Sequence, residues 1–441
     1  MVLNNKLISG WGRNVFKNCK TVDFEDIAQI KNFKKLKKIA RGNGRSYGDS
    51  SIKPDCTVEM RAKNRLLYFD VKKGIVIAES GMINNDLLKI IVKSGWFLPV
   101  TPGTKFVSVG GMVASNVHGK NHHLDGGISN FVESFRIYCK TGKIKECSRQ
   151  KNKELFYMTI GGMGLTGIIL SVKLKLLKIE TSFIRQKKEI TNNLKETMSI
   201  FSNCKDQYCV AWLNFSGSKD KIGSSVVFIG NHIKKKDLKI HERNAKLIYP
   251  SKISYSLPFK FRFSLINYYT TILFNHMYFF LQKFMLKKIV DIDTFFYPLD
   301  KIRNWNLVYG NKGFIQYQFV IPIRNSYSGL IEIMNVLRSN KVYPMLPVLK
   351  LFEREDIGVL SFPLRGYSLA MDFPDTKKIR QLLLNIDKIV IKNKGRVYLT
   401  KDSRITKKNF NEMYKDKIRK FKKSTHYDPK VFASAQSNRL F

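Results

Sequence analysis

The chain has 441 residues, 44% of them hydrophobic, so it can bury at least one sizeable core and is not a disordered polypeptide. At about 150 residues per domain, this length predicts two or three domains. Lysine and arginine total 78 against 34 acidic residues, a formal net charge of +44. Such an excess indicates attraction to nucleic acid, an anionic membrane or a phosphorylated substrate, although a lysine-rich composition inherited from an AT-rich genome explains it equally well. No recognisable nucleic-acid module accompanies it.

The six cysteines are spread thinly, without a C-x-x-C pair or a disulfide-rich spacing. This usage favours ordinary thiols in a reducing compartment. Residues 1–6 show no apolar stretch of the kind that secretory signal peptides carry. We therefore expect a cytoplasmic protein.

The first third of the chain predicts a strand-rich α+β domain. Residues 74–78 are typical of a short buried strand, residues 86–94 carry apolar side chains at helical spacing, and residues 135–144 alternate around a turn as a hairpin does. Alternation at 172–176 predicts a strand with one buried and one wet face. We place the first domain boundary near Ile179, where a lysine-rich stretch begins.

An aromatic segment marks the middle of the chain. Residues 263–282 carry no formal charge, and about 20 apolar residues suffice for a membrane span. Two asparagines and a histidine interrupt the segment and basic residues flank it, which favours a core or lid helix, or an interfacial helix lying on a membrane, over a span. Further on, residues 396–399 predict a strand, followed by a very basic helical tail.

A glycine-rich loop lies at residues 41–48, after a short apolar run. Its glycines permit positive φ, so that successive backbone N–H groups can turn toward one anion. The spacing is G-x-G-x-x-x-G and no amphipathic helix follows directly, so the loop is not the Rossmann fingerprint. It is compatible with a pyrophosphate site and with an ordinary tight turn.

Two further stretches are rich in small residues. Residues 102–123 hold three of the seven histidines, and residues 159–168 lead into the strand at 172–176. Small residues allow a backbone to approach a flat ligand closely. His118 and His122 have the spacing of zinc ligands on a helix, but the surrounding glycines disfavour a helix and no third ligand lies nearby, so we predict no metal site. The combination favours a dinucleotide lying along extended backbone.

Short motifs follow one another along nearly the whole chain. They include Gly10-Trp11-Gly12-Arg13, Gly44-Arg45-Ser46-Tyr47-Gly48-Asp49, Pro102-Gly103-Thr104, His118-Gly119-Lys120-Asn121, Gly161-Gly162-Met163-Gly164, Gly313-Phe314-Ile315-Gln316, Asp372-Phe373-Pro374 and Tyr398-Leu399-Thr400-Lys401. As a set and in this order, they resemble the decaprenylphosphoryl-ribose oxidases of the vanillyl-alcohol-oxidase superfamily.

The resemblance implies an α+β fold with a PCMH-type, two-subdomain FAD-binding domain at residues 1–179. It implies a central antiparallel-sheet substrate-binding (cap) domain at 180–394, with an aromatic lid or membrane-facing segment near 253–290. Residues 395–441 are expected to complete the FAD-binding domain.

The resemblance also implies where FAD lies. Tyr47 stands where relatives that attach FAD covalently often carry a histidine, so FAD is expected to be non-covalent. The residues expected to bind it are Arg41, Gly42, Asn43, Gly44, Arg45, Ser46, Tyr47, Gly48, Gly103, Ser108, Val109, Gly110, Gly111, Ser115, Asn116, Val117, His118, Ile168 and Tyr398.

The reaction implied is the removal of a hydride and a proton from a secondary sugar alcohol. Lys401 matches the family's active-site lysine and is expected either to take the proton or to orient the hydroxyl, since the pKa of a lysine falls readily on burial. His118 is the second expected catalytic residue. The expected substrate pocket consists of Tyr47, Trp212, Gln316, Gln318, Lys350 and Lys401.

Two positions depart from the family pattern. Ala370 stands where mycobacterial members carry a cysteine, so covalent capture by thiol-directed inhibitors is not expected there. Ser368 stands where an asparagine is usual. These changes bear on the identity of the sugar and lipid more than on the flavin chemistry.

The function expected from the resemblance is FAD-dependent oxidation of the 2′-hydroxyl of a polyprenyl-phosphate-linked pentose, ribose. A separate NAD(P)H-dependent short-chain reductase would reduce the keto-sugar, giving net 2′-epimerisation for a cell-envelope arabinan-type precursor. The enzyme is expected to contact an anionic membrane peripherally, at its inner face, and to bind no nucleic acid. One alternative is an FAD-dependent oxidase of a soluble alditol or sugar lactone. A second is a basic membrane- or nucleic-acid-binding protein with a non-catalytic flavin fold.

Overall fold

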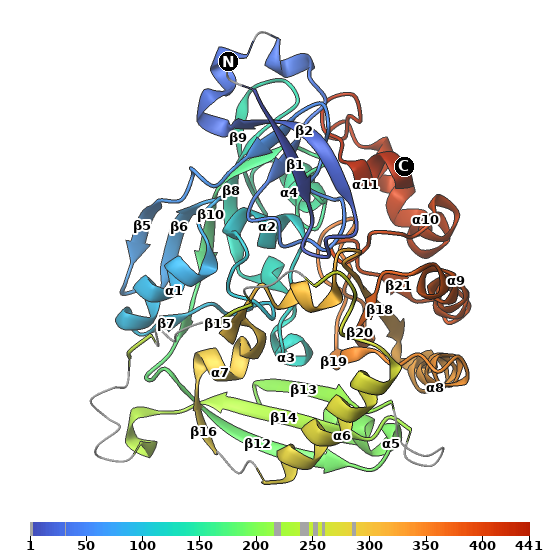
Figure 1. Cartoon of the computed structure of the whole chain (residues 1–441). Helices are drawn as coiled ribbons and strands as arrows, with labels where there is room; N and C mark the ends of the chain where they lie inside the picture. The colour runs from blue at the N-terminus through green and yellow to red at the C-terminus, as the bar shows by residue number, and fades with distance from the viewer. Residues whose placement is uncertain are drawn as a thin grey trace.

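The computed structural model describes residues 3–30, 32–215, 222–238, 247–249, 255–257, 261–284 and 288–441. The N-terminal part forms an upper lobe, the central part a lower lobe, and the last helices lie along one side (Figure 1). Both lobes combine helices with largely antiparallel sheets, as an α+β fold does.

The upper lobe contains two sheets. The four-stranded sheet has the order β1-β2-β4-β3, with β1 at Asn4–Ser9, β2 at Phe16–Asp23, β4 at Thr57–Glu59 and β3 at Ile39–Arg41. The five-stranded sheet has the order β5-β6-β10-β8-β9, with β5 at Leu66–Asp70, β6 at Ile75–Glu79, β10 at Ile168–Lys175, β8 at Val132–Tyr138 and β9 at Ile144–Ser148. Around them lie α1 (Asn84–Ile91), α2 (Val109–Ala114), α3 (His122–Asp125), α4 (Lys153–Thr159) and the short strands β7 (Trp96–Phe97) and β11 (Leu177–Lys178).

The elements predicted for this lobe are present. The buried strand is β6, the helix is α1 with a 3₁₀ turn that ends at Gly95, and the hairpin is β8–β9. The alternation predicted at 172–176 is confirmed in β10, where Lys173 and Lys175 reach solvent while Val172 and Leu174 are buried. The first half of the strand, residues 168–171, is buried on both faces, because the strand lies in the middle of its sheet and α2 packs against it.

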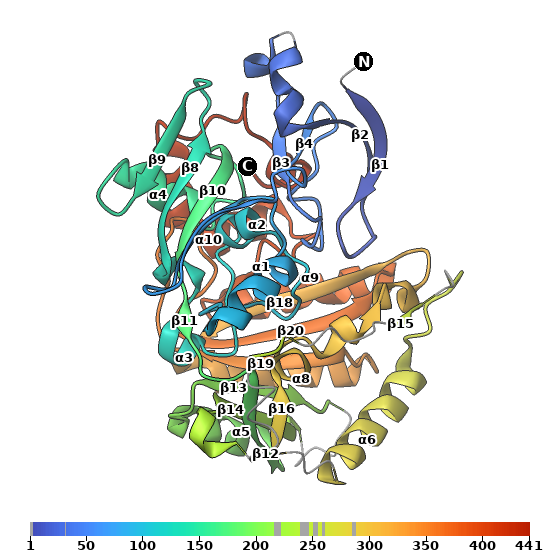
Figure 2. The same ribbon diagram turned by 90° about the vertical axis from the view of Figure 1, so that its left-hand side faces the viewer.

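An eight-stranded sheet forms the lower lobe. Its order is β16-β12-β14-β13-β19-β20-β18-β21, with β16 at Ile289–Asp291, β12 at Phe183–Thr191, β14 at Ser225–His232, β13 at Tyr208–Leu213, β19 at Met345–Phe352, β20 at Gly366–Pro374, β18 at Phe314–Pro322 and β21 at Arg396–Val397. Helices α5 (Leu194–Asn203), α8 (Ile323–Ser339) and α9 (Lys377–Lys392) pack on one face of it (Figures 1 and 2).

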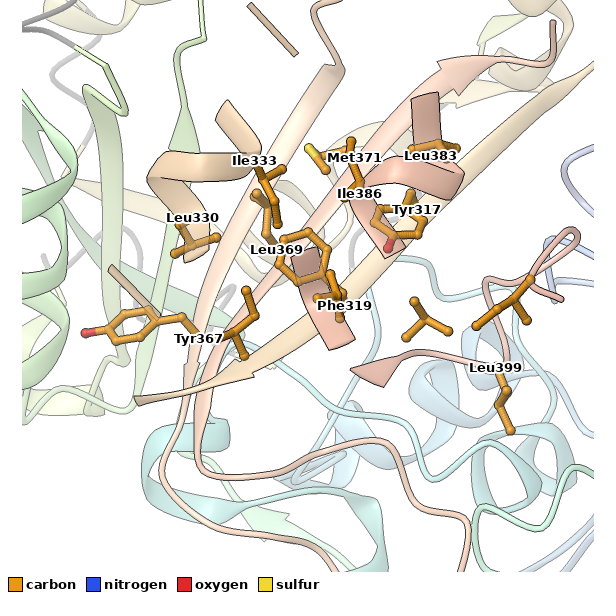
Figure 3. Packing of buried hydrophobic residues seen from close by; sticks show 14 of the residues in the cluster. Tyr317, Phe319, Leu330, Ile333, Tyr367, Leu369, Met371, Leu383, Ile386 and Leu399 are labelled. Carbon is orange, nitrogen blue, oxygen red and sulfur yellow. The ribbon is translucent and has the colours of Figure 1, made fainter. Parts of the chain in front are cut away.

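The strands of this sheet alternate between an apolar face and a polar face, because successive side chains of a strand point to opposite sides. Tyr317, Phe319 and Leu369 point toward the covering helices, where they pack with Leu330 and Ile386 in the main hydrophobic core (Figure 3). The intervening residues point to the other face, toward the upper lobe. That face carries the polar side chains of the candidate site.

The C-terminal segment is attached to both lobes. β21 pairs with β18, and α10 (Lys407–Lys423) packs against α9. Beyond α10, Phe432 forms a parallel bridge with Lys38 of the upper lobe, and α11 (Ala435–Leu440) places Arg439 3.0 Å from Asp49. Residues 395–441 therefore connect the upper lobe to the lower sheet.

The predicted aromatic segment contains α6 (Tyr268–Phe284), while parts of the range 253–290 lie outside the described residues. Short elements flank it: β15 (Tyr255–Ser256), β17 (Ile302–Arg303) and α7 (Ile292–Phe296). The ring of Tyr278 on α6 packs against Trp212 of β13, with centroids 4.6 Å apart. None of the helices described has both the length and the apolar character needed to cross a bilayer.

Candidate active site

A cavity of about 1040 Å³ lies between the glycine-rich loops of the upper lobe and the polar face of the lower sheet. Side chains from α6 and α7 contribute further walls. This volume is at the upper end of the roughly 300–1,000 Å³ found for ligand sites, which leaves room for a large cofactor together with a substrate.

The glycine-rich wall of the cavity is shaped by close contacts that only glycine allows. A Cβ atom at Gly42 would lie 2.0 Å from the hydroxyl of Ser108, and one at Gly110 would lie 2.6 Å from the Cβ of Ser80. A Cβ atom at Gly103 would instead meet no atom within 4 Å, although Gly103 lines the cavity. The backbone at Gly103 is therefore open to a bound group.

The same wall presents free hydrogen-bond donors. The backbone N–H groups of residues 43–46 donate to no protein acceptor within the described part of the chain. The guanidinium of Arg45 stacks 4.0 Å from the ring centroid of Trp11, and its buried Nε has no hydrogen-bond partner among the residues that the structure describes. Consecutive free amides beside a cation form a concave site for an anion such as a pyrophosphate.

The polar face of the lower sheet supplies a hydrogen-bonded network. Gln316 and Asp372 are directly opposite each other on β18 and β20, and the Gln316 amide donates to the Asp372 carboxylate at 2.7 Å. The Gln318 amide donates to the Ser368 hydroxyl at 3.0 Å and lies 3.0 Å from Nε2 of His118. The register of β18 and β20 thus fixes the two glutamines in the cavity.

His118 comes from the upper lobe and is 6% exposed. The ring centroids of Phe352 and Tyr398 lie 4.8 and 5.4 Å from that of His118, and its Nδ1 has no hydrogen-bond partner in the described part of the chain. Burial, and after it the charge of Lys350, holds the pKa of His118 well below its ordinary value. The imidazole is therefore neutral near pH 7 and can accept or donate one hydrogen bond.

Lys401 follows β21 at the point where the chain enters the cavity. Its Nζ lies 3.9 Å from the ring centroid of Tyr47 and faces no hydrogen-bond acceptor in the described residues. Burial lowers the pKa of Lys401, while the carboxylate of Asp372 partly offsets this. The pKa of Asp372 is raised by burial, and the hydrogen bond from Gln316 acts against the rise.

Most of the residues predicted from the sequence line this single cavity. They are Gly42, Asn43, Gly44, Arg45, Ser46, Tyr47, Gly103, Ser108, Gly110, Gly111, Ser115, Val117, His118, Trp212, Gln316, Gln318, Lys350, Tyr398 and Lys401.

Five predicted residues do not line the cavity, because each is committed to packing or to bonds elsewhere. Arg41 donates to the Ser9 carbonyl and the Ser51 hydroxyl, and Asn116 donates to Asp356 and Ser361. Gly48 is packed so closely that a Cβ would lie 2.0 Å from the Asp402 carbonyl. Val109 and Ile168 are fully buried among apolar side chains. These five residues therefore contribute to the packing of the fold and not to the cavity lining.

The sequence prediction missed several residues of the cavity. Asp372 and Lys120 line it, as do Phe274 and Tyr278 of α6. Asp372 and Lys120 lie inside the family motifs given above, so the sequence offered a reason to expect them in the site. Nothing in the sequence pattern marked which side chains of α6 face inward.

Comparison with known proteins agrees with this geometry. Residues 19–148 match the model of an FAD binding domain. The chain is 32% identical to the decaprenylphosphoryl-β-D-ribose oxidase of Mycolicibacterium smegmatis over 409 residues, which cover 91% of this chain and 88% of that protein. The L-gulonolactone oxidase of Mus musculus is 31% identical over 166 residues (36% of this chain, 37% of its own length). The D-lactate dehydrogenase of Anaerostipes hadrus is 30% identical over 142 residues (31% and 30%).

The fold, the glycine-walled cavity and the matching FAD-binding model define an FAD-dependent oxidoreductase. This confirms the predicted fold class and cofactor. The similarity extends over nearly the whole chain, and the chain belongs to the decaprenylphosphoryl-β-D-ribose oxidase family.

The residues present fit FAD. The free amides of residues 43–46 and the guanidinium of Arg45 suit its pyrophosphate, and the open backbone at Gly103 allows a flat group to lie close. When bound, FAD supplies the hydride acceptor for oxidation of an alcohol, while the protein orients the alcohol and manages its proton.

Proposed function

We propose that this enzyme oxidises the 2′-hydroxyl of a polyprenyl-phosphate-linked ribose to a keto group. The observation that carries the proposal is the single cavity in which Lys401, His118 and Gln318 meet beside the FAD-binding wall, in a chain that aligns with 88% of a decaprenylphosphoryl-β-D-ribose oxidase. The relatives named as lactone or lactate enzymes align with only about a third of this chain, so an alditol or lactone oxidase is less well supported.

In this proposal Lys401 takes the proton of the reacting hydroxyl. Burial lowers its pKa, so a larger fraction of neutral amine is available than in a solvated lysine. His118, held by Gln318 at 3.0 Å, positions the hydroxyl through a hydrogen bond. Trp212 and Tyr47 form walls of the pocket and keep water from the reacting atoms.

We further propose that the substrate reaches the cavity from a membrane surface. α6 supports this, because its two faces differ. Phe274 and Tyr278 line the cavity, whereas the opposite side exposes a stripe of large apolar side chains. These are Tyr269, Leu273, Met277, Phe280, Leu281 and Phe284, each at least 46% exposed. Exposed apolar side chains on a protein of net charge +44 suit an anionic lipid surface.

We also propose that the enzyme is cytoplasmic, lies at the inner face of the membrane and works with a separate NAD(P)H-dependent short-chain reductase. The keto-sugar product would be reduced by that partner to give net 2′-epimerisation for cell-envelope synthesis. A keto-sugar on an activated lipid carrier is reactive, which is why a reductase is expected to consume it.

A substrate panel tests the proposed function. The holoenzyme is assayed with an artificial dye acceptor on a short-chain polyprenyl-phosphoryl ribose, on xylitol and on a sugar lactone, and the sugar product is analysed after borodeuteride trapping. We expect turnover of the ribosyl lipid and of neither xylitol nor the lactone. Borodeuteride reduction of the keto group should then place deuterium at C2 of the sugar. Preferential turnover of the polyol or the lactone would overturn the proposal.

A further inference from the structure

Five lysines line the active-site cavity; Lys188 donates to Gln282 and Lys301 is exposed, which leaves Lys120, Lys350 and Lys401. In the described part of the chain none of them lies within ion-pair distance of a carboxylate. The nearby Lys105 behaves differently, since its Nζ contacts Asp293 at 2.5 Å. A buried ammonium without an anionic partner is unfavourable, so three in one cavity need an explanation.

Lys401 has an electrostatic partner in Asp372, but Lys120 and Lys350 have no anionic partner among the described residues. The ammonium of Lys120 is held beside α7, where it donates to the Phe295 carbonyl and lies 4.5 Å from the centroid of the Phe295 ring. That bond uses one of its three N–H donors. Lys350 projects from β19 on the polar face of the sheet, in register with Ser368.

The backbone brings the two lysines to neighbouring places: the Lys120 carbonyl accepts from the N–H of Cys209 on β13 at 2.9 Å, and β13 pairs with β19, which carries Lys350. Burial, and then the charge of Lys350, lowers the pKa of Lys120 to about 7. Burial alone lowers the pKa of Lys350 to about 8. An anion placed between these lysines would restore their ordinary protonation and relieve the repulsion.

We propose that Lys120 and Lys350 form a subsite that binds the phosphodiester group of the substrate. The inference rests on the proposed function, which supplies a substrate with one phosphate between sugar and lipid. Neither the family model nor the predicted site assigned a role to Lys120.

The position of the two lysines in the cavity separates this subsite from the one that suits the FAD pyrophosphate. The free amides that suit the pyrophosphate belong to residues 43–46 of the upper lobe. Lys350 instead lies on the lower sheet, and Lys120 lies against α7.

The subsite also lies next to the reacting groups. Lys350 lies opposite Ser368, and the Ser368 hydroxyl accepts from the same Gln318 amide that contacts His118, so Lys350 and His118 share one region of the cavity. The charge of Lys350 also contributes to the lowered pKa of His118 and Lys401. In a pentosyl 1-phosphate the 2-hydroxyl is on the carbon adjacent to the phosphorylated one. Anchoring the phosphate at Lys120 and Lys350 would therefore bring the 2-hydroxyl to the catalytic groups and would set which hydroxyl reacts.

The first test is calorimetric binding of a short-chain polyprenyl-phosphoryl ribose to the FAD-loaded enzyme. Wild type is compared with Lys120→Gln, Lys350→Gln and Lys120→Arg, and with Lys408→Gln on the exposed face of α10 as a variant of equal charge change. FAD content is checked in each by its visible spectrum. The neutral control ligand is the alkyl riboside of the same chain length, which lacks the phosphate.

We expect Lys120→Gln and Lys350→Gln each to weaken binding of the phosphorylated ligand by about 10-fold or more, as loss of a charge-assisted hydrogen bond does. Binding of the neutral riboside should stay unchanged, and Lys120→Arg should retain most of the affinity. Near pH 8 the wild type should take up protons on binding the phosphorylated ligand, seen as a dependence of the heat on the buffer, and Lys120→Gln should take up fewer.

Equal losses for both ligands, or no loss for either, would overturn the subsite. Loss of FAD together with ligand binding would do the same, because it would place the two lysines at the cofactor. The binding assay is independent of turnover. If the phosphorylated ligand binds through the two lysines but its ribose is not oxidised, the proposed function fails and the subsite stands.

Discussion

Lys401 and Tyr47 are 354 positions apart in the chain (401 − 47), yet the ammonium of Lys401 lies 3.9 Å from the ring centroid of Tyr47. A backbone hydrogen bond holds them in register, since the N–H of Tyr47 donates to the Thr400 carbonyl at 3.0 Å. Gly48 lets the chains approach there, because a Cβ would lie 2.0 Å from the Asp402 carbonyl. The first glycine loop and the end of β21 thus form one unit of the active site.

Removing the Lys401 amine is expected to abolish most of the chemistry without loss of cofactor. Lys401→Met should lower the rate of flavin reduction by about 10²–10⁴-fold, the usual contribution of a general base. The FAD spectrum should be retained, since the anion-binding amides belong to residues 43–46. Stopped-flow absorbance measures the rate, and Lys408→Met on α10 is the control. A Lys401→Met enzyme with the wild-type rate would show that another group takes the proton.

The pH dependence of the reaction should report the environment of Lys401. Burial lowers the pKa of this amine, and the Asp372 carboxylate raises it in part. Because the neutral amine is the active form, kcat should rise with pH and level off below the ordinary lysine pKa of about 10.4. kcat is used because it reports the enzyme–substrate complex, in which the bound phosphate keeps Lys120 and Lys350 charged. Asp372→Asn removes the carboxylate that favours the charged form, so this rise should move to lower pH. A move to higher pH would contradict the assignment.

FAD is expected to be released by acid precipitation. Tyr47 stands in the glycine loop where a histidine would permit a covalent bond, and no cysteine lines the cavity in the described residues. Visible absorption of the supernatant and the pellet decides the point. A chromophore that stays in the pellet would mean a covalent link that this structure does not account for.

Two glycines should respond differently to substitution. A side chain at Gly103 meets no protein atom within 4 Å, so Gly103→Val should leave the stability of the apoprotein unchanged but weaken FAD binding by about 10-fold or more, because it projects into the cavity. Gly110→Val should destabilise the fold itself, since its Cβ would press on Ser80. Denaturant unfolding and FAD titration separate the two effects. Equal loss of stability in both variants would count against an open cavity wall at Gly103.

The apolar stripe on α6 should bind anionic vesicles. The double variant Leu273→Glu/Phe280→Glu is expected to reduce co-sedimentation with phosphatidylglycerol vesicles while leaving FAD content intact, because both side chains point away from the protein and are 68% and 60% exposed. Tyr327→Glu on α8, also at an exposed aromatic position, is the matched control. Unchanged vesicle binding in the double variant would remove α6 from the proposed membrane contact.

The sequence was most informative where close backbone approach restricts the choice of residue, which made the glycine loops predictable. His118 and Lys401 were expected from the family resemblance of the motifs around them, since a lone histidine or lysine carries no such signal in so basic a chain. Arg41 was expected at FAD because it opens the glycine loop, yet its guanidinium turns back to the Ser9 carbonyl. Local sequence gives the loop but not the direction of a long side chain.

Long-range pairing explains the remaining gaps. Lys120 and Asp372 were visible in motifs, but only the folded chain shows that they line the same cavity as Lys350 and Lys401. The alternation at 172–176 correctly predicted the lysines of β10 that reach solvent, but it did not show that residues 168–171 are buried on both faces in the middle of the sheet. The exposed stripe of α6 likewise depends on which of its faces covers the cavity.

The most direct test of the central claim is anaerobic mixing of the oxidised holoenzyme with a short-chain polyprenyl-phosphoryl ribose, followed by the flavin absorbance. We predict bleaching of the oxidised flavin band in a single turnover, with one equivalent of 2-keto-sugar formed, and no bleaching by a soluble alditol at the same concentration. A flavin that stays oxidised with the ribosyl lipid but is bleached by the alditol would contradict the account.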